Sequence, residues 1–312
     1  MRYFFTLLTA TLFCFARPPE TIAKSSSDSN HPHRAPFSLQ IGDIETNLET
    51  ISIMVMPGER VLIQADVPLG INQDHSIARN GAWEWKAPKK PGLYSLKLTH
   101  EARHISLHIF VLTPFDTAVE ESIGTFKIGS YQQSLFKGQK SYAPPQGFIA
   151  VTEQMRDIQI SPHFTLGQFI CKQENDNGIS YALINPAMLL KLERLLEVVN
   201  DAGHPAKSFH IMSGFRTPWY NASIGNKTSV SRHLYGDGVD LFIDEDGDNY
   251  MDDLNGDGVS NKADAQILYS LASLLSAENI DDWKGGGLSL YKEKPHRGPF
   301  IHLDARGYQA RW

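Results

Sequence analysis

The sequence predicts an α+β protein in which a small β-rich unit precedes a mixed half with a long helix. Three observations lead to this prediction. Apolar and polar residues alternate with period two within residues 37–113, a leucine stripe with helical spacing follows Asn185, and short strand-forming runs bounded by polar residues occur near residues 240 and 300. A chain of 312 residues, 41% of them hydrophobic, is long enough for two domains that each bury a core.

The first residues, MRYFFTLLTATLFCFA, are typical of a secretory signal. One arginine precedes an uncharged apolar run that ends in a small residue, which predicts a signal peptide over 1–16 and a periplasmic or extracellular location. A lipoprotein anchored at Cys14 is the alternative, although the residues before Cys14 suit it poorly. No later stretch approaches the roughly 20 apolar residues of a spanning helix, so no transmembrane segment is expected. Cleavage after Ala16 leaves Cys171 alone, and we expect a buried, inert thiol there.

The net charge of -6 disfavours a nucleic-acid partner. Residues 17–36, rich in Ser, Pro, His and Asp, predict a linker. Residues 37–113 combine alternating strands with the aromatic and turn residues of WEWKAPKKPGLYSLKLTH, which predicts an immunoglobulin-like β-sandwich. Its histidines at 100, 104 and 108 share a strand face about 13 Å apart, too far to bind one metal together, so they are expected to be solvated.

Residues 114–160 mix aromatic, Gly and Pro residues and predict a connecting subdomain. The clearest helix follows Asn185, because Pro186 suits a first helical turn and Gly203 can end the helix. Its apolar stripe comprises Leu189, Leu192, Leu195, Leu196 and Val199. This helix is expected to be scaffold.

Three segments carry the candidate chemistry: SGFRTPWYN (213–221), SRHLYGDGVDLFID (231–244) and GPFIHLDARGYQARW (298–312). His233 precedes Asp240 by seven residues, and glycines between them allow the backbone to turn. Asp240 projects from a strand with an apolar opposite face, and His302 lies in a second apolar strand. Two imidazoles and one carboxylate suit zinc and leave a fourth position for water. Zinc lowers the pKa of water toward about 7, which suits hydrolysis of an amide bond.

Together these segments resemble the zinc D-alanyl-D-alanine carboxypeptidase family, whose fold is shared with the vancomycin-resistance dipeptidases and the hedgehog signalling domain. The family motif SxHxxGxAxD is matched by SRHLYGDGVD at Ser231, His233, Gly236 and Asp240, with Gly238 where the family often has Ala. The resemblance implies that His302 is the third ligand, in the FIHLD form of the branch associated with murein endopeptidases.

The resemblance covers about residues 160–312. It implies a hedgehog-type zinc peptidase domain over 161–312 and a substrate among peptidoglycan stem or cross-link peptides, cleaved by carboxypeptidase or endopeptidase action. It also implies that Arg216 contacts the substrate and stabilises developing negative charge. A surface arginine in a salt bridge is the alternative.

The general base is where the chain departs from the dipeptidases, which have a Glu three residues before the final histidine. Position 299 is Pro. Asp304, on the strand face of His302, is the first candidate base, and a carboxylate that orients His302 is the equal alternative. His296 is a further candidate acid or base. The departure leaves open a catalytically inactive cell-wall-binding module that retains the metal site.

An acidic insert over 244–264 contains eight carboxylates and one lysine, a net charge of -7. Its second part has the spacing of a calcium loop and resembles those of dockerin modules, with ligands at Asp253, Asn255, Asp257, Val259 (through its carbonyl), Asn261 and Asp264. Upstream residues repeat part of the spacing and leave a second ion open, at Asp244, Asp246, Asp248 and Asp252. Bound calcium is expected to order the insert and a helix beginning near Ala263. A calcium-dependent adhesion protein is the more distant alternative.

Overall fold

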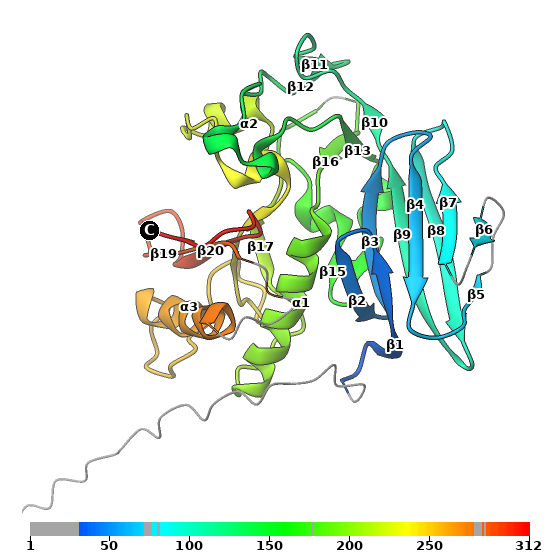
Figure 1. Cartoon of the computed structure of the whole chain (residues 1–312). Coiled ribbons are helices and arrows are strands. Elements are labelled where there is room, and N and C mark those ends of the chain that lie inside the picture. The colour runs from blue at the N-terminus through cyan, green and yellow to red at the C-terminus, as the bar shows by residue number, and fades with distance from the viewer. Residues whose placement is uncertain (1–30, 72–75, 80–81, 176, 278–282, 284) are drawn as a thin grey trace, which may run out of the picture.

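The α+β class predicted from the sequence is confirmed by the computed structural model of the chain (Figure 1). The structure describes residues 31–71, 76–79, 82–175, 177–277, 283 and 285–312. The predicted signal peptide, with Cys14, lies outside the described residues, as does most of the predicted linker. The last residues of that linker belong to the first strand, β1, which begins at Arg34.

Two sheets face each other in the N-terminal part of the chain (Figure 1). The first has the order β2 (Ile44–Leu48), β1 (Arg34–Ile41), β4 (Arg60–Ala65), β7 (Ala82–Lys86) and β6 (Ser76–Arg79). The second has the order β3 (Thr50–Val55), β9 (Arg103–Val111), β8 (Gly92–His100) and β5 (Gly70–Ile71). The alternation in β9 buries Ile105 and Leu107 completely while His104 is exposed, as the period-two pattern predicts.

The middle of the chain, predicted as a connecting subdomain, packs against the C-terminal half. Its β10 (Thr113–Pro114) and β13 (Gly147–Val151) form a sheet with β16 (Ser180–Ala182). Two separate hairpins pair β11 (Ser122–Ile123) with β12 (Phe126–Lys127), and β14 (Gln159–Ser161) with β15 (Phe164–Thr165). Short 3-10 turns η1 to η4 span Phe136–Gly138, Lys140–Tyr142, Glu153–Met155 and Leu166–Phe169. A buried aromatic cluster, including Phe126 and Phe148, joins the segment to Phe215 and Leu234.

The C-terminal half is built on a sheet in the order β17 (His210–Ser213), β18 (Gly238–Phe242), β20 (Phe300–Asp304), β19 (Gly287–Tyr291) and β21 (Ala310–Arg311). Its helices are α1 (Pro186–Asp201), α2 (Pro218–Ser223), α3 (Lys262–Ala277) and the 3-10 turn η5 (Arg232–Tyr235). The predicted start of α1 is confirmed, because the Asn185 side chain caps it by accepting the N–H of Ala187. None of the described helices is long and apolar enough to cross a membrane.

Helix α1 lies between the N-terminal sheets and the C-terminal sheet (Figure 1). Arg34 on β1 donates to Glu197 on α1 over 2.7 Å, and Ser52 on β3 donates to the carbonyl of Ile160 over 2.9 Å. One continuous apolar cluster contains buried residues from both sides of α1. The C-terminal sheet, which carries the candidate site, therefore rests on a helix that the N-terminal sheets support.

Candidate metal centre

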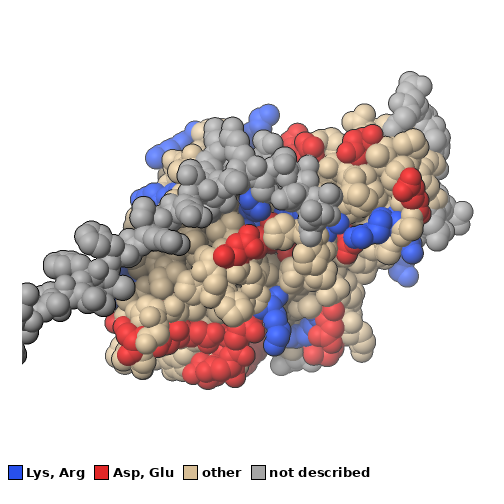
Figure 2. Space-filling view, turned by 90° about the horizontal axis from the view of Figure 1, so that it is seen from below, with Lys and Arg blue, Asp and Glu red and all other residues tan. Residues whose placement is uncertain are grey.

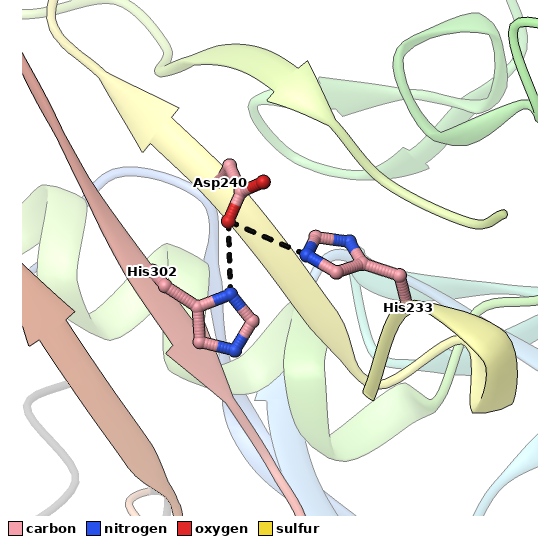
Figure 3. Close-up of side chains that lie close together, drawn as sticks. All are labelled: His233, Asp240 and His302. Carbon is pink, nitrogen blue, oxygen red and sulfur yellow. Dashed lines mark hydrogen bonds and ion pairs between the residues drawn. The ribbon is translucent and has the colours of Figure 1, made fainter. Parts of the chain in front are cut away.

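The three predicted zinc ligands converge in the structure. His233 comes from η5, Asp240 from β18 and His302 from β20, and Figure 3 shows both imidazoles approaching the same carboxylate oxygen. The distances to Asp240 Oδ1 are 3.3 Å from His233 Nε2 and 2.9 Å from His302 Nδ1. One potential ligand atom from each residue lies within 4.8 Å of the others, and all three residues are buried. Residues separated by up to 69 positions therefore form one compact cluster.

Strand register and two glycines produce this convergence. Asp240 and His302 are direct cross-strand partners in the antiparallel β18–β20 ladder, so their side chains share one face of the sheet. Gly236 ends η5 in the left-handed region with φ 69°, which turns the chain from His233 into β18. A Cβ at Gly238 would lie 2.7 Å from the Cβ of Arg232. That crowding explains why position 238 is glycine, where the family that the motif resembles often has alanine.

Nδ1 of His233, the ring nitrogen that does not face Asp240, is fixed as a hydrogen-bond donor. Nδ1 lies 2.8 Å from the carbonyl oxygen of Gly214, which can only accept. In the neutral ring the hydrogen is thus on Nδ1, and Nε2 presents a lone pair to Asp240. Burial lowers the pKa of His233, so a second proton on this ring is disfavoured.

His302 has the complementary arrangement. Its Nε2 lies 3.2 Å from Oδ2 of Asp304, so the neutral tautomer with its hydrogen on Nε2 donates to Asp304 and directs the Nδ1 lone pair toward Asp240. Burial opposes protonation, but hydrogen bonds to Asp240 and Asp304 outweigh it and raise the pKa of His302 to about 9. Two neutral rings would direct both lone pairs at one anionic oxygen, which is repulsive unless a cation lies between them. The donor set therefore fits a divalent ion, in competition with a proton on His302.

Arg216 binds the other oxygen of the same carboxylate. Its Nη2 donates to Asp240 Oδ2 over 2.7 Å, and its Nε donates to Ser213 Oγ over 2.7 Å. Burial opposes ionisation of Asp240, but His233 and His302 outweigh it and hold its pKa well below the usual range. The structure therefore places the Arg216 guanidinium beside the cluster, paired with Asp240, and its contact with a substrate stays a prediction.

Asp304 contacts His302 through Nε2, the ring nitrogen that does not face Asp240. Its Oδ1 accepts the N–H of Gly287 over 2.7 Å and Nε of Arg306 over 2.9 Å, and the residue is fully buried. Burial raises the pKa of Asp304, but His302 and Arg306 outweigh burial and depress it strongly. These contacts favour the orienting interpretation over the general base. His296 is exposed in the turn between β19 and β20, outside the cluster.

Residues that support Asp304 were not singled out from the sequence. Lys191 on α1 donates to the Asp304 carbonyl over 3.0 Å, and Arg306 binds the carboxylate. The GGG run over 285–287 was an available signal. A Cβ at Gly286 would overlap the Asp304 carbonyl oxygen, and one at Gly287 would overlap its carboxylate. Glycine is needed there because Asp304 fills the space above the backbone.

The acidic insert follows β18, and Figure 2 shows acidic side chains gathered at the end of the molecule that carries α3. In the upstream part, carboxylate oxygens of Asp244, Asp246 and Asp248 come within 4.8 Å of one another, and the Asp252 carboxylate accepts the N–H of Glu245.

In the downstream part, Asp264 is fully buried and accepts backbone N–H groups from Leu254, Asn255 and Asn261. Asp253 accepts the N–H groups of Gly256 and Gly258 in the same way. The predicted helix near Ala263 is confirmed as α3, with Asp264 in its first turn.

No family model, curated protein or solved structure matches the chain. Function is therefore inferred from the geometry of the site together with the motif resemblance.

Proposed function

We propose that the chain is an exported zinc-dependent peptidase that hydrolyses peptide bonds in peptidoglycan stem or cross-link peptides. The observation that carries the metal assignment is the pair of imidazole nitrogens, on His233 and His302, directed at one oxygen of Asp240. The motif resemblance supplies the substrate class. On the basis of the resemblance we assign a hedgehog-type zinc domain to residues 161–312, and on the basis of strand alternation an immunoglobulin-like sandwich to residues 37–113.

Each residue of the centre has a distinct role in this proposal. His233, Asp240 and His302 would hold the ion, with the Gly214 carbonyl fixing the His233 tautomer and Asp304 accepting from His302 Nε2. When bound, zinc supplies Lewis-acid polarisation of a carbonyl and activates water at neutral pH. Arg216 orients the ligand carboxylate and places positive charge beside the centre, where an anionic substrate group or a developing oxyanion would be stabilised.

A second candidate is a wall-binding module that retains the metal and lacks turnover. The contacts of Asp304 favour it, because a carboxylate bound to Arg306, Gly287 and His302 is poorly placed to accept a proton from water. Calcium in the acidic insert is proposed for both candidates as a structural ion, because eight carboxylates within 21 residues repel one another without a cation.

Zinc content and muropeptide cleavage measured on the same samples test the proposal. Wild type is expected to bind one zinc ion and to release products that a zinc chelator abolishes. His233→Gln should lose both zinc and cleavage, whereas His104→Gln, at an exposed histidine on β9, should retain both. Muropeptide binding without cleavage would favour the second candidate, and absence of stoichiometric zinc would contradict both.

A further inference from the structure

A large aromatic side chain lies beside the metal centre and remains accessible. The Trp312 indole is centred 5.3 Å from the His302 ring, and the residue is 55% exposed. Large aromatic residues usually bury most of their surface, so an exposed indole next to a buried polar cluster is a candidate ligand contact.

The indole is held in place by neighbours on β19. Its Nε1 donates to Tyr291 Oη over 2.9 Å, and the Trp312 carbonyl accepts from Ser289 Oγ. Ser289 is buried and is the cross-strand partner of His302. The Arg306 guanidinium lies 5.1 Å from the indole. A fixed aromatic surface loses little conformational entropy when a ligand packs on it.

The strand order places Trp312 opposite Arg216. Arg216 follows β17 at one edge of the sheet, the ligands Asp240 and His302 lie on the central strands, and Trp312 follows β21 at the other edge. A peptide bound across the centre would therefore meet a guanidinium on one side and an indole on the other. The guanidinium and the indole favour different chemical groups in the substrate residues on the two sides of the scissile bond.

We propose that Trp312 is a specificity-determining residue that forms the wall of a subsite for an aliphatic side chain of the peptide, on the β21 side of the metal centre. This proposal rests on the proposed peptidase function. The part of the peptide that contacts Trp312 is apolar, because the indole nitrogen already donates to Tyr291. Only the π faces and ring edges of the indole are left for contact.

Kinetics of Trp312→Ala and Trp312→Phe on a stem peptide test the subsite. The Ala variant should raise KM roughly tenfold with little change in kcat, and Phe should recover part of the loss. Trp83→Phe is the matched control, because this half-buried indole lies on β7 of the N-terminal sheets and should leave KM unchanged. An unchanged KM in Trp312→Ala would overturn the proposal. Loss of zinc from that variant would overturn it too, since the indole would then act by supporting His302.

A binding readout separates this proposal from the peptidase assignment. Tryptophan emission of zinc-loaded wild type is expected to shift when the stem tetrapeptide is added, and Trp312→Phe should lack this shift while Trp83→Phe retains it. If wild type cleaves nothing but shows the Trp312-dependent shift, the peptidase proposal fails and the subsite stands. If the peptide produces no Trp312-dependent shift, the subsite is overturned whatever the activity.

Discussion

The ring of His302 lies between two carboxylates, each fixed by an arginine. Asp240 receives Arg216 and faces Nδ1, while Asp304 receives Arg306 and faces Nε2. When neutral and with its hydrogen on Nε2 toward Asp304, this ring directs its Nδ1 lone pair at the cluster. The second carboxylate therefore prepares a nitrogen for a metal ion.

Asp304→Asn should weaken zinc binding, by about 10- to 100-fold, because the amide is a poorer acceptor for the His302 ring and for Arg306. Zinc affinity measured against a competing chelator checks this expectation. Asp66→Asn, a carboxylate that accepts the N–H of Ser38 in the N-terminal part, is the control. Unchanged affinity combined with lost cleavage would instead assign Asp304 the role of base.

The environment of His163 predicts how the free energy of unfolding depends on pH. His163 Nδ1 lies 2.6 Å from the buried carboxylate of Glu193 on α1, and this hydrogen bond raises the pKa of His163 from 6.5 despite burial. A raised folded pKa stabilises the fold below the unfolded value, and the stabilisation disappears as pH rises through the folded value.

His163→Gln should therefore lower the free energy of unfolding by roughly 1 kcal/mol at about pH 5.5 and by much less at about pH 8.5. Urea unfolding of both proteins at the two pH values measures the difference, in which contributions of other titrating groups cancel. A difference that is the same at both pH values would show that the pair contributes only through packing.

At the scale of helices and strands, elements with a regular sequence pattern were predictable, whereas contacts between segments distant in the sequence were not. The α1 boundaries followed from Asn185, Pro186 and the leucine stripe, and the cluster was predicted from the motif resemblance, which supplied His302 as its third member. The parallel pairing of β3 with β9 depends on contacts between distant segments, which no local pattern specifies. The support of Asp304 by Lys191 was equally hidden, since a buried lysine on a helix has no distinctive spacing.

The acidic insert supports a prediction about ion removal. Calcium should raise the melting temperature, and a calcium-selective chelator should lower it by several degrees, because the ion offsets repulsion among the carboxylates and orders the segment before α3. Differential scanning fluorimetry with and without chelator measures the shift.

Two variants divide the effect between the two parts of the insert. Asp246→Asn acts on the upstream carboxylate group, and Asp253→Asn acts on the predicted downstream loop. The part that binds calcium is the one whose variant reduces the chelator response. A melting temperature indifferent to calcium in wild type would exclude a structural ion.

Over the whole molecule, helix α1 contacts both the N-terminal sheets and the strand that carries the candidate ligand His302. Helix α1 is bound to Arg34 through Glu197 and to the Asp304 carbonyl through Lys191. The buried apolar cluster runs continuously through both halves. Cooperative unfolding is expected where packing is continuous, so the two halves should lose structure together.

Ser52→Ala tests this coupling at a single hydrogen bond. Ser52 is buried on β3, and its hydroxyl donates to the carbonyl of Ile160, which belongs to β14 beyond the N-terminal sheets. Its removal leaves a carbonyl without this donor and should cost about 1 kcal/mol, or roughly 2 °C in melting temperature. Hydrogen exchange followed in β8–β9 and in β18–β20 should shift by the same amount, because one cooperative unit opens at both places. A change confined to β8–β9 would mean that the halves unfold independently and that α1 transmits no stability to the metal centre.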